Sequence, residues 1–98
     1  MQISAALNEY FDKQEAFLDT FIDSGSDHEL FVASYIHGHF SVIAANTLQQ
    51  VAHFSSAQEA TDYFVTQLNR SITEAIGNGE LSEQDAEDVT IMLARITN

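Results

Sequence analysis

Cysteine, proline and tryptophan are absent from the sequence, and basic side chains are scarce: three lysines and arginines stand against fifteen aspartates and glutamates in 98 residues. Without cysteine the chain cannot form a disulfide framework, a thiolate metal site or a cysteine nucleophile. The absence of proline fits long, uninterrupted helices. The formal net charge of −12 argues against direct binding to nucleic acid or to an anionic membrane. The length predicts a single helical domain over residues 1–98.

Long apolar runs are also missing. Glu9, Asp12 and Glu15 interrupt the N-terminal segment before any apolar run begins, so we expect no secretory signal there. The longest stretch without a formal charge covers residues 30–58, but its histidines, asparagine and glutamines are too polar for bilayer hydrocarbon. These features predict a cytoplasmic protein with no membrane partner.

Apolar side chains recur at helical spacing in four segments, which predicts an all-α fold. Short breaks between the segments place successive helices side by side, as in a four-helix antiparallel bundle. The expected helices run from residue 2 to 23, from 27 to about 52, from a Ser56 cap to the glycines at 77–79, and onward from a Ser82 cap. The second helix is apolar all round, so it is expected to be the central and most buried element.

Local signals mark where these helices begin and end. Ser26 with Glu29, and Ser56 with Glu59, have the spacing of capping boxes, in which side chains satisfy free backbone N–H groups. The glycines at 77–79 end the third helix because glycine enters the left-handed conformation without steric cost.

Core residues follow from the same periodicity. Gly38 lies inside the second helix, where glycine lowers helix stability by about 1 kcal/mol relative to alanine. We expect this cost to be offset only if a neighbouring helix approaches so closely that a side chain would not fit. The seven phenylalanines form either a core or the lining of a ligand pocket, and their helical spacing favours the core. We expect burial of Phe31, Ile36, Phe40, Leu48, Leu68, Ile72, Val89 and Leu93.

Two segments are distinctive: DHELFVASYIHGHF at residues 27–40, and AIGNGELS at residues 75–82 followed by Asp85. With their surroundings they extend over residues 26–93 and resemble the recurring segments of the YfcL family of small bacterial proteins. The chain has His37 where an arginine is expected before the glycine. The resemblance implies a small, acidic, cytoplasmic helical protein, and it brings no activity, substrate, cofactor or catalytic residue with it.

Histidines and carboxylates do not fall at catalytic or metal-binding spacings. His28-Glu29 is followed by Val32 where the zinc motif His-Glu-x-x-His needs histidine, and none of the four histidines follows a glutamate by three residues. His37 and His39 point ~200° apart around a helix. No nucleophile elbow or glycine-rich phosphate loop is present. We therefore expect a non-enzymatic protein with no metal, no cofactor and no catalytic residue.

Carboxylates opposite the apolar arc of the first helix form the first candidate for a partner site: Asp12, Glu15, Asp19 and Asp23. A basic surface on another protein would complement this acidic face. The alternatives are an acidity that only keeps the protein soluble, or an imitation of nucleic acid. The acids at the start of the fourth helix have a structural explanation, since they stabilise the helix dipole.

A polar, charge-free stripe on the second helix is the other candidate: His28, Tyr35, His39, Asn46 and His53 fall within ~40° of arc. It is either the helix's window on solvent or a surface that meets a partner or a second copy of the chain, centred on Tyr35 and His39. Histidine changes charge between about pH 5 and 8, so binding to a neutral partner is expected to weaken on acidification. The competing interpretation is a small ligand or metal bound by these histidines.

Overall fold

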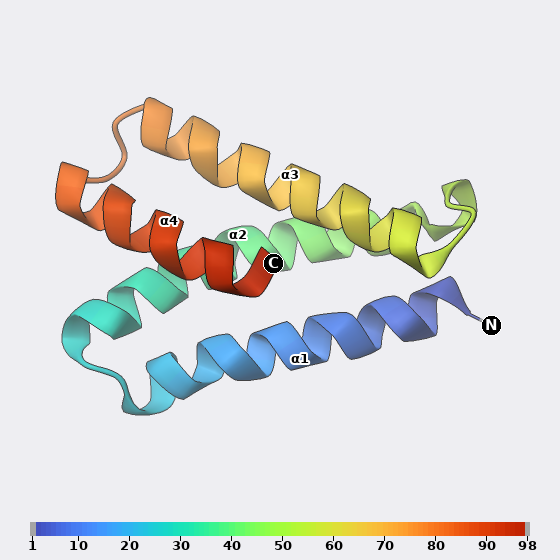
Figure 1. The fold of residues 1–98 in the computed structure, drawn as a ribbon, viewed down its shortest axis with the longest axis horizontal. Coiled ribbons are helices and arrows are strands. Elements are labelled where there is room, and N and C mark those ends of the chain that lie inside the picture. Colours follow the sequence, from blue (N-terminus) through green and yellow to red (C-terminus); the bar gives the residue numbers. More distant parts are fainter. Residues whose placement is uncertain (1, 98) are drawn as a thin grey trace.

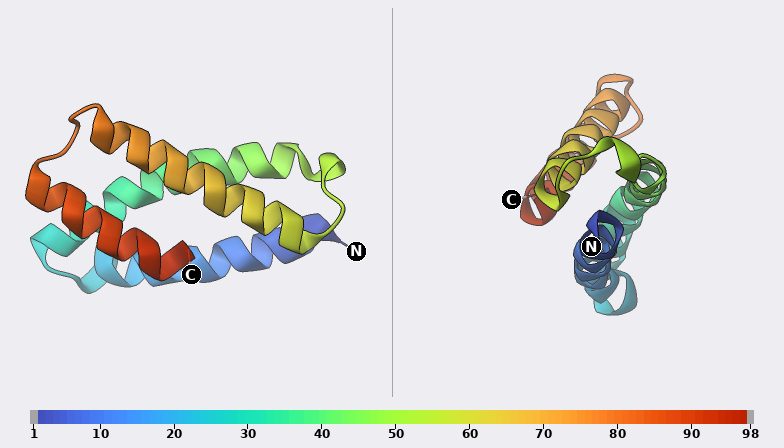
Figure 2. Two further views of the ribbon diagram at one scale, coloured as in Figure 1. Left: turned by 45° about the horizontal axis from the view of Figure 1, so that its top comes forward. Right: turned by 90° about the vertical axis from the view of Figure 1, so that its right-hand side faces the viewer.

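The computed structural model describes residues 2–97. The elements are α1 (Ile3–Ser24), α2 (Asp27–Gln49), a 3-10 turn η1 (Val51–His53), α3 (Ala57–Gly77) and α4 (Glu83–Thr97). Consecutive helices run antiparallel, and α2 packs against each of the other three (Figure 1). The molecule measures 41 × 29 × 19 Å, and its shortest dimension equals about two helix diameters. The predicted four-helix bundle with a central second helix is confirmed, and Figure 2 shows its two layers end-on.

Serine caps begin the last three helices. The box at Ser26 is complete: its Oγ accepts the Glu29 N–H at 3.1 Å, and Glu29 Oε1 accepts the Ser26 N–H at 2.9 Å. Ser56 Oγ accepts the Glu59 N–H at 3.1 Å, but the Glu59 carboxylate accepts from the N–H of Ser55, one residue earlier than predicted. A capping side chain bonds to a backbone N–H two or three residues away, so the spacing of residues in the sequence is enough to predict these helix starts.

The third helix ends in a Schellman motif. The Glu80 N–H reaches the Ala75 carbonyl at 3.3 Å, and the Gly79 N–H reaches the Ile76 carbonyl at 3.0 Å. Gly79 has φ of +81°, a conformation that is unstrained for glycine alone. The glycine segment thus turns the chain from α3 into α4, as predicted.

The second helix is shorter than predicted. It ends at Gln49, and residues Val51–His53 form η1 instead of a last helical turn. The Gln50 N–H bonds to the Thr47 carbonyl at 3.0 Å, an i to i−3 contact that tightens the backbone into 3-10 geometry. Apolar residues continue across this point, so the periodicity gave no sign of the change.

Aromatic side chains fill the centre of the bundle. The Phe64 ring lies 4.7 Å from Phe11 and 5.0 Å from Phe40, centroid to centroid, distances typical of favourable edge contacts. The residues whose predicted burial is confirmed are Ile36, Phe40, Leu68, Ile72, Val89 and Leu93.

Two core predictions on α2 need correction. Phe31 is 42% exposed, with its ring 6.3 Å from that of Tyr35 on the outside of the helix. Leu48 is half-buried and packs on the edge of the core. A helix that is apolar all round offers no polar face to show which side turns outward, so periodicity cannot place these residues. No neighbouring helix approaches Gly38 either: a Cβ built there meets nothing within 4 Å.

Within the described part of the chain, no helix combines the length and the hydropathy that crossing a membrane requires.

Candidate functional site

The predicted acidic face lies on the outer side of α1. Asp12, Asp19 and Asp23 are exposed. Glu15 is half-buried, and its Oε2 lies 3.4 Å from Nε2 of His37 on α2. The structure therefore brings the four carboxylates onto one surface and ties one of them to a histidine that points away from the predicted stripe.

The polar stripe of α2 turns toward α3 and α4. The Tyr35 hydroxyl donates to Glu80 Oε1 at 3.0 Å. His39 Nδ1 lies 2.8 Å from Ser71 Oγ of α3, and its ring is 5.0 Å from that of Tyr35. The two side chains at the centre of the predicted docking surface thus already have partners within the chain.

The environment of Tyr35 holds its hydroxyl in the neutral form. Burial raises the pKa of Tyr35 from its ordinary 10.0 to about 12, and the hydrogen bond to the Glu80 carboxylate and the negative charge of Glu80 act in the same direction. A neutral tyrosine hydroxyl can donate a hydrogen bond, as Tyr35 does to Glu80.

The far end of the stripe lies near η1. Asn46 Oδ1 accepts from Gln50 Nε2 at 3.0 Å, and the same amide lies 3.1 Å from the Tyr63 hydroxyl. His53 is exposed on η1. Because α2 stops at Gln49, His53 is not placed by the helical geometry from which the stripe was predicted.

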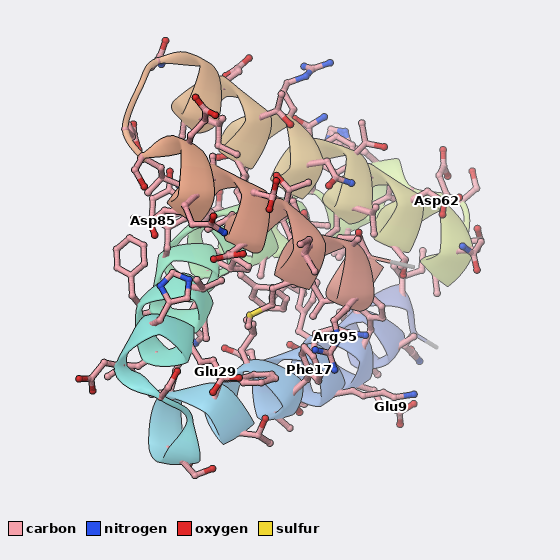
Figure 3. All side chains as sticks on the ribbon, turned by 60° about the vertical axis from the view of Figure 1, so that its left-hand side comes forward. Glu9, Phe17, Glu29, Asp62, Asp85 and Arg95 are labelled. Atoms are coloured by element: carbon pink, nitrogen blue, oxygen red, sulfur yellow. The ribbon has the colours of Figure 1, made fainter. Side chains whose placement is uncertain are left out.

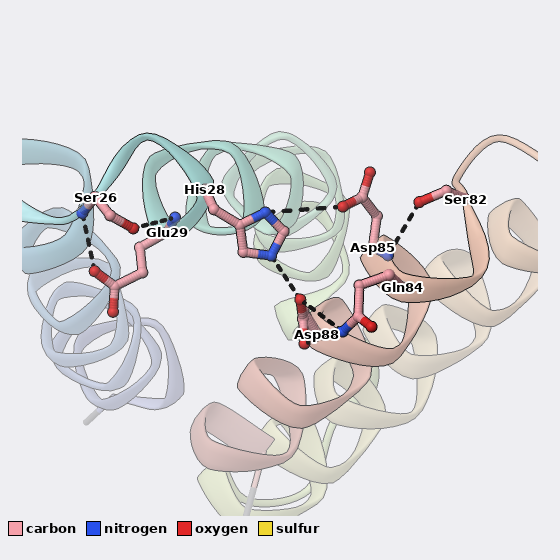
Figure 4. Close-up of polar contacts among 7 residues, drawn as sticks. All are labelled: Ser26, His28, Glu29, Ser82, Gln84, Asp85 and Asp88. Atoms are coloured by element: carbon pink, nitrogen blue, oxygen red, sulfur yellow. Dashed lines mark hydrogen bonds and ion pairs between the residues drawn. The ribbon is translucent and has the colours of Figure 1, made fainter.

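His28 joins the beginnings of α2 and α4 (Figure 4). Its Nε2 donates to Asp88 Oδ2 at 2.6 Å, and its Nδ1 lies 3.8 Å from Asp85 Oδ1. Gln84 Nε2 also reaches the Asp88 carboxylate, at 3.2 Å. The bond from His28, and then that from Gln84, lower the pKa of Asp88 below its ordinary 3.8. These contacts connect α2 to α4, and the two side chains of the shorter contact, His28 and Asp88, lie 60 residues apart in sequence.

The two carboxylates contact different nitrogens of the His28 ring, so the three side chains do not converge on one point between them. Residues 2–97 place no group of three or more histidine, aspartate or glutamate side chains where they could hold a metal ion.

Sequence periodicity missed a groove between α2 and α4, which we call the α2–α4 groove. It has a volume of about 220 Å³. In the sequence, Ile91 is a signal of this groove, because it is a large apolar residue that lies off the buried stripe of its helix. In the structure, Ile91 is 57% exposed. The lining residues are His28, Glu29 and Val32 from α2, and Asp88, Ile91, Met92 and Arg95 from α4.

Arg95 lines this groove and also stacks on aromatic rings of α1. Its guanidinium lies 5.0 Å from the ring centroid of Phe17 and 5.8 Å from that of Phe21, both on α1. Stacking of this kind is worth about 0.5–1 kcal/mol at an exposed site. Figure 3 shows Phe17, Glu29 and Arg95 gathered on one side of the molecule.

The fold and these surfaces define a small acidic four-helix bundle whose described charged side chains are exposed or half-buried. The family model described as YfcL protein matches residues 8–98, and the chain belongs to this family, as the two sequence segments indicated. Over 77 residues it is 35% identical to "Uncharacterized protein YfcL" of Escherichia coli (strain K12). This alignment covers 79% of this chain and 77% of that protein. No solved structure matches the chain.

Proposed function

We propose that this protein is a non-enzymatic, cytoplasmic interaction module that docks on a basic surface of another protein. The docking surface is the acidic face of α1, formed by Asp12, Glu15, Asp19 and Asp23. The supporting observation is that Asp12, Asp19 and Asp23 are exposed, and that the ion pair found on this face within residues 2–97 joins Glu15 to His37. The ion pairs found among residues 2–97 all involve histidine, and no lysine or arginine takes part in one.

Exposed, unneutralised carboxylates favour encounter with a basic partner over long distances. Charged surfaces steer association and set specificity more than they set final affinity. Such an interface weakens as salt is added, because the screening length is only about 8 Å at physiological ionic strength.

The polar stripe of α2 is a weaker candidate for the docking surface. Tyr35 and His39 engage Glu80 and Ser71, so a partner that used them would have to replace these internal bonds. The α1 face has no comparable competition at Asp12, Asp19 or Asp23, and this favours α1 as the docking surface.

Charge reversal on α1 tests the proposal. The tagged protein is used to capture binders from a lysate of its native cell, and the double variant Asp19→Lys, Asp23→Lys is compared with wild type. We expect the variant to lose the binders, and wild type to lose them as sodium chloride rises, since both changes remove the attraction.

A matched control changes the same number of charges elsewhere. Glu83→Lys with Glu87→Lys alters two exposed acids, four residues apart on α4, and is expected to keep the binders. Capture that survives both high salt and the α1 reversal would contradict the proposal and leave the acidic face as an aid to solubility.

A further inference from the structure

The α2–α4 groove is an opening that the bundle itself leaves unfilled. Among residues 2–97, α4 packs mainly on α2, meets α3 at few positions, and stays apart from α1 along most of its length. They meet where the Tyr10 hydroxyl donates to the Ile96 carbonyl at 3.3 Å and where Arg95 lies over Phe17. Residues of α2 and α4 therefore border an accessible, mainly apolar surface, which is the α2–α4 groove.

Size indicates which kind of occupant fits. Pockets for metabolites and cofactors usually measure about 300–1,000 Å³, and this groove has about 220 Å³. It has room for one or two side chains of a partner. Val32 and Met92 form a buried apolar floor and Ile91 an exposed apolar rim. Methionine adapts its shape to different apolar side chains.

Charge indicates the chemistry of the partner. Glu29 and Asp88 both line the groove, in a protein of net charge −12. Glu29 accepts from the Ser26 N–H, and Asp88 accepts from His28 and Gln84, but a carboxylate has lone pairs left for a further donor. Arg95 lies seven residues beyond Asp88, which is about 10 Å along the helix axis. A cationic side chain is attracted beside Glu29 and Asp88 and repelled beside Arg95, so the groove also orients what it binds.

We propose that the α2–α4 groove binds a basic amphipathic helix of a partner protein. Its apolar anchor packs on Val32, Ile91 and Met92, and a lysine or arginine of its polar face lies beside the carboxylates. Helices bind helical grooves in this way through apolar residues spaced three and four apart.

The inference rests on the proposed role in protein binding but concerns a second surface. Phe17 and Asp19 are two residues apart on α1, so their side chains point about 200° apart. The ring beneath Arg95 therefore faces away from the acidic face. A partner that uses both surfaces must reach around α1, and each surface can be tested without the other.

The probe is a synthetic amphipathic peptide with leucines on one face and lysines on the other, added to the full chain. Binding is measured by fluorescence anisotropy and located by NMR chemical shifts. We expect the largest shifts at Val32, Ile91 and Met92. A scrambled peptide of the same composition, which keeps the charge and loses the apolar face, is expected to bind more weakly.

A pair of substitutions separates the groove from general charge. Ile91→Lys and Val42→Lys each place a lysine at an exposed apolar position, 57% and 66% exposed respectively, and each changes the net charge equally. We expect Ile91→Lys to weaken peptide binding about tenfold or more, because it replaces an apolar contact of the anchor with a charge, and Val42→Lys to leave it near wild type.

A second pair keeps the test informative if Ile91→Lys fails to fold. Arg95→Glu and Arg70→Glu also change the charge equally, and only Arg95 lines the groove. Arg95→Glu is expected to bind the peptide more tightly than Arg70→Glu. Shifts confined to the acidic face of α1, equal binding of the scrambled peptide, or no difference within the substitution pair that folds would each overturn the inference. None of these outcomes bears on the lysate capture that tests the α1 face.

Discussion

His28 connects the first turn of α2 to the first two turns of α4. Its ring donates to Asp88 at 2.6 Å while the same carboxylate also accepts from Gln84. Both donors stabilise the ionised form of Asp88, which is why the pKa of this group is lowered on folding. The contribution to stability is present above the ordinary carboxyl pKa and is lost as pH falls through the lowered value.

Asp88→Asn should therefore change how the protein responds to acid. We expect the variant to be less stable than wild type near neutral pH, and to lose less stability between about pH 5 and pH 2, because the titrating group is gone. Urea unfolding followed by circular dichroism measures both quantities. Glu87→Gln, at an exposed acid of the same helix, is the control. If Asp88→Asn and wild type lost the same free energy of unfolding on acidification, the hydrogen bond from His28 to Asp88 would not contribute to the pH dependence of stability.

Single residues also show where sequence reasoning stops. The Ser26 cap was predictable because its partner lies three residues away. The Tyr35–Glu80 and His39–Ser71 bonds join residues 45 and 32 positions apart, and only the packing of the helices decides that they meet. Periodicity predicted the helices and most of the core. The exposure of Phe31 depends on how the other helices pack around α2, which the pattern within α2 does not contain.

Among the helices, glycine has opposite consequences at two positions. Gly38 lies within α2 and Gly79 at the turn that follows α3, and a Cβ built at either meets nothing within 4 Å. Packing is therefore equal at the two positions, and the backbone differs. Gly38 has helical geometry, whereas Gly79 has φ of +81°.

Alanine at these positions should shift stability in opposite directions. Gly38→Ala is expected to raise the free energy of unfolding by about 0.5–1 kcal/mol, because alanine loses less conformational freedom in a helix. Gly79→Ala is expected to lower it by about 1–2 kcal/mol, the cost of a left-handed alanine. Chemical denaturation of both variants gives the comparison. If Gly79→Ala raised the free energy of unfolding, the turn would be able to adopt another backbone conformation without cost.

For the whole molecule, charge of one sign dominates. A net charge of −12 in 98 residues causes self-repulsion that favours expansion. The attractive pairs that salt would weaken are few, since those found among residues 2–97 involve only histidines. Screening should therefore help the folded state more than it harms it.

Thermal unfolding should shift upward with ionic strength. Raising salt from about 0.01 M to about 0.15 M shortens the screening length from about 30 Å to about 8 Å, so we expect the melting temperature to rise. The Asp19→Lys, Asp23→Lys variant carries −8 instead of −12, because each substitution changes the charge by two, and it should respond less. A melting temperature that falls with salt would show that local attractions outweigh the repulsion.

The scarcity of cations has a further consequence, which concerns proteolysis. Trypsin cleaves after lysine and arginine, and this chain offers it Lys13, Arg70 and Arg95. Lys13 and Arg70 lie within α1 and α3, and a protease reaches a helical bond only after the helix has opened. The rate of tryptic cleavage at these two sites therefore reports how often the bundle opens, with no contribution from the connecting loops.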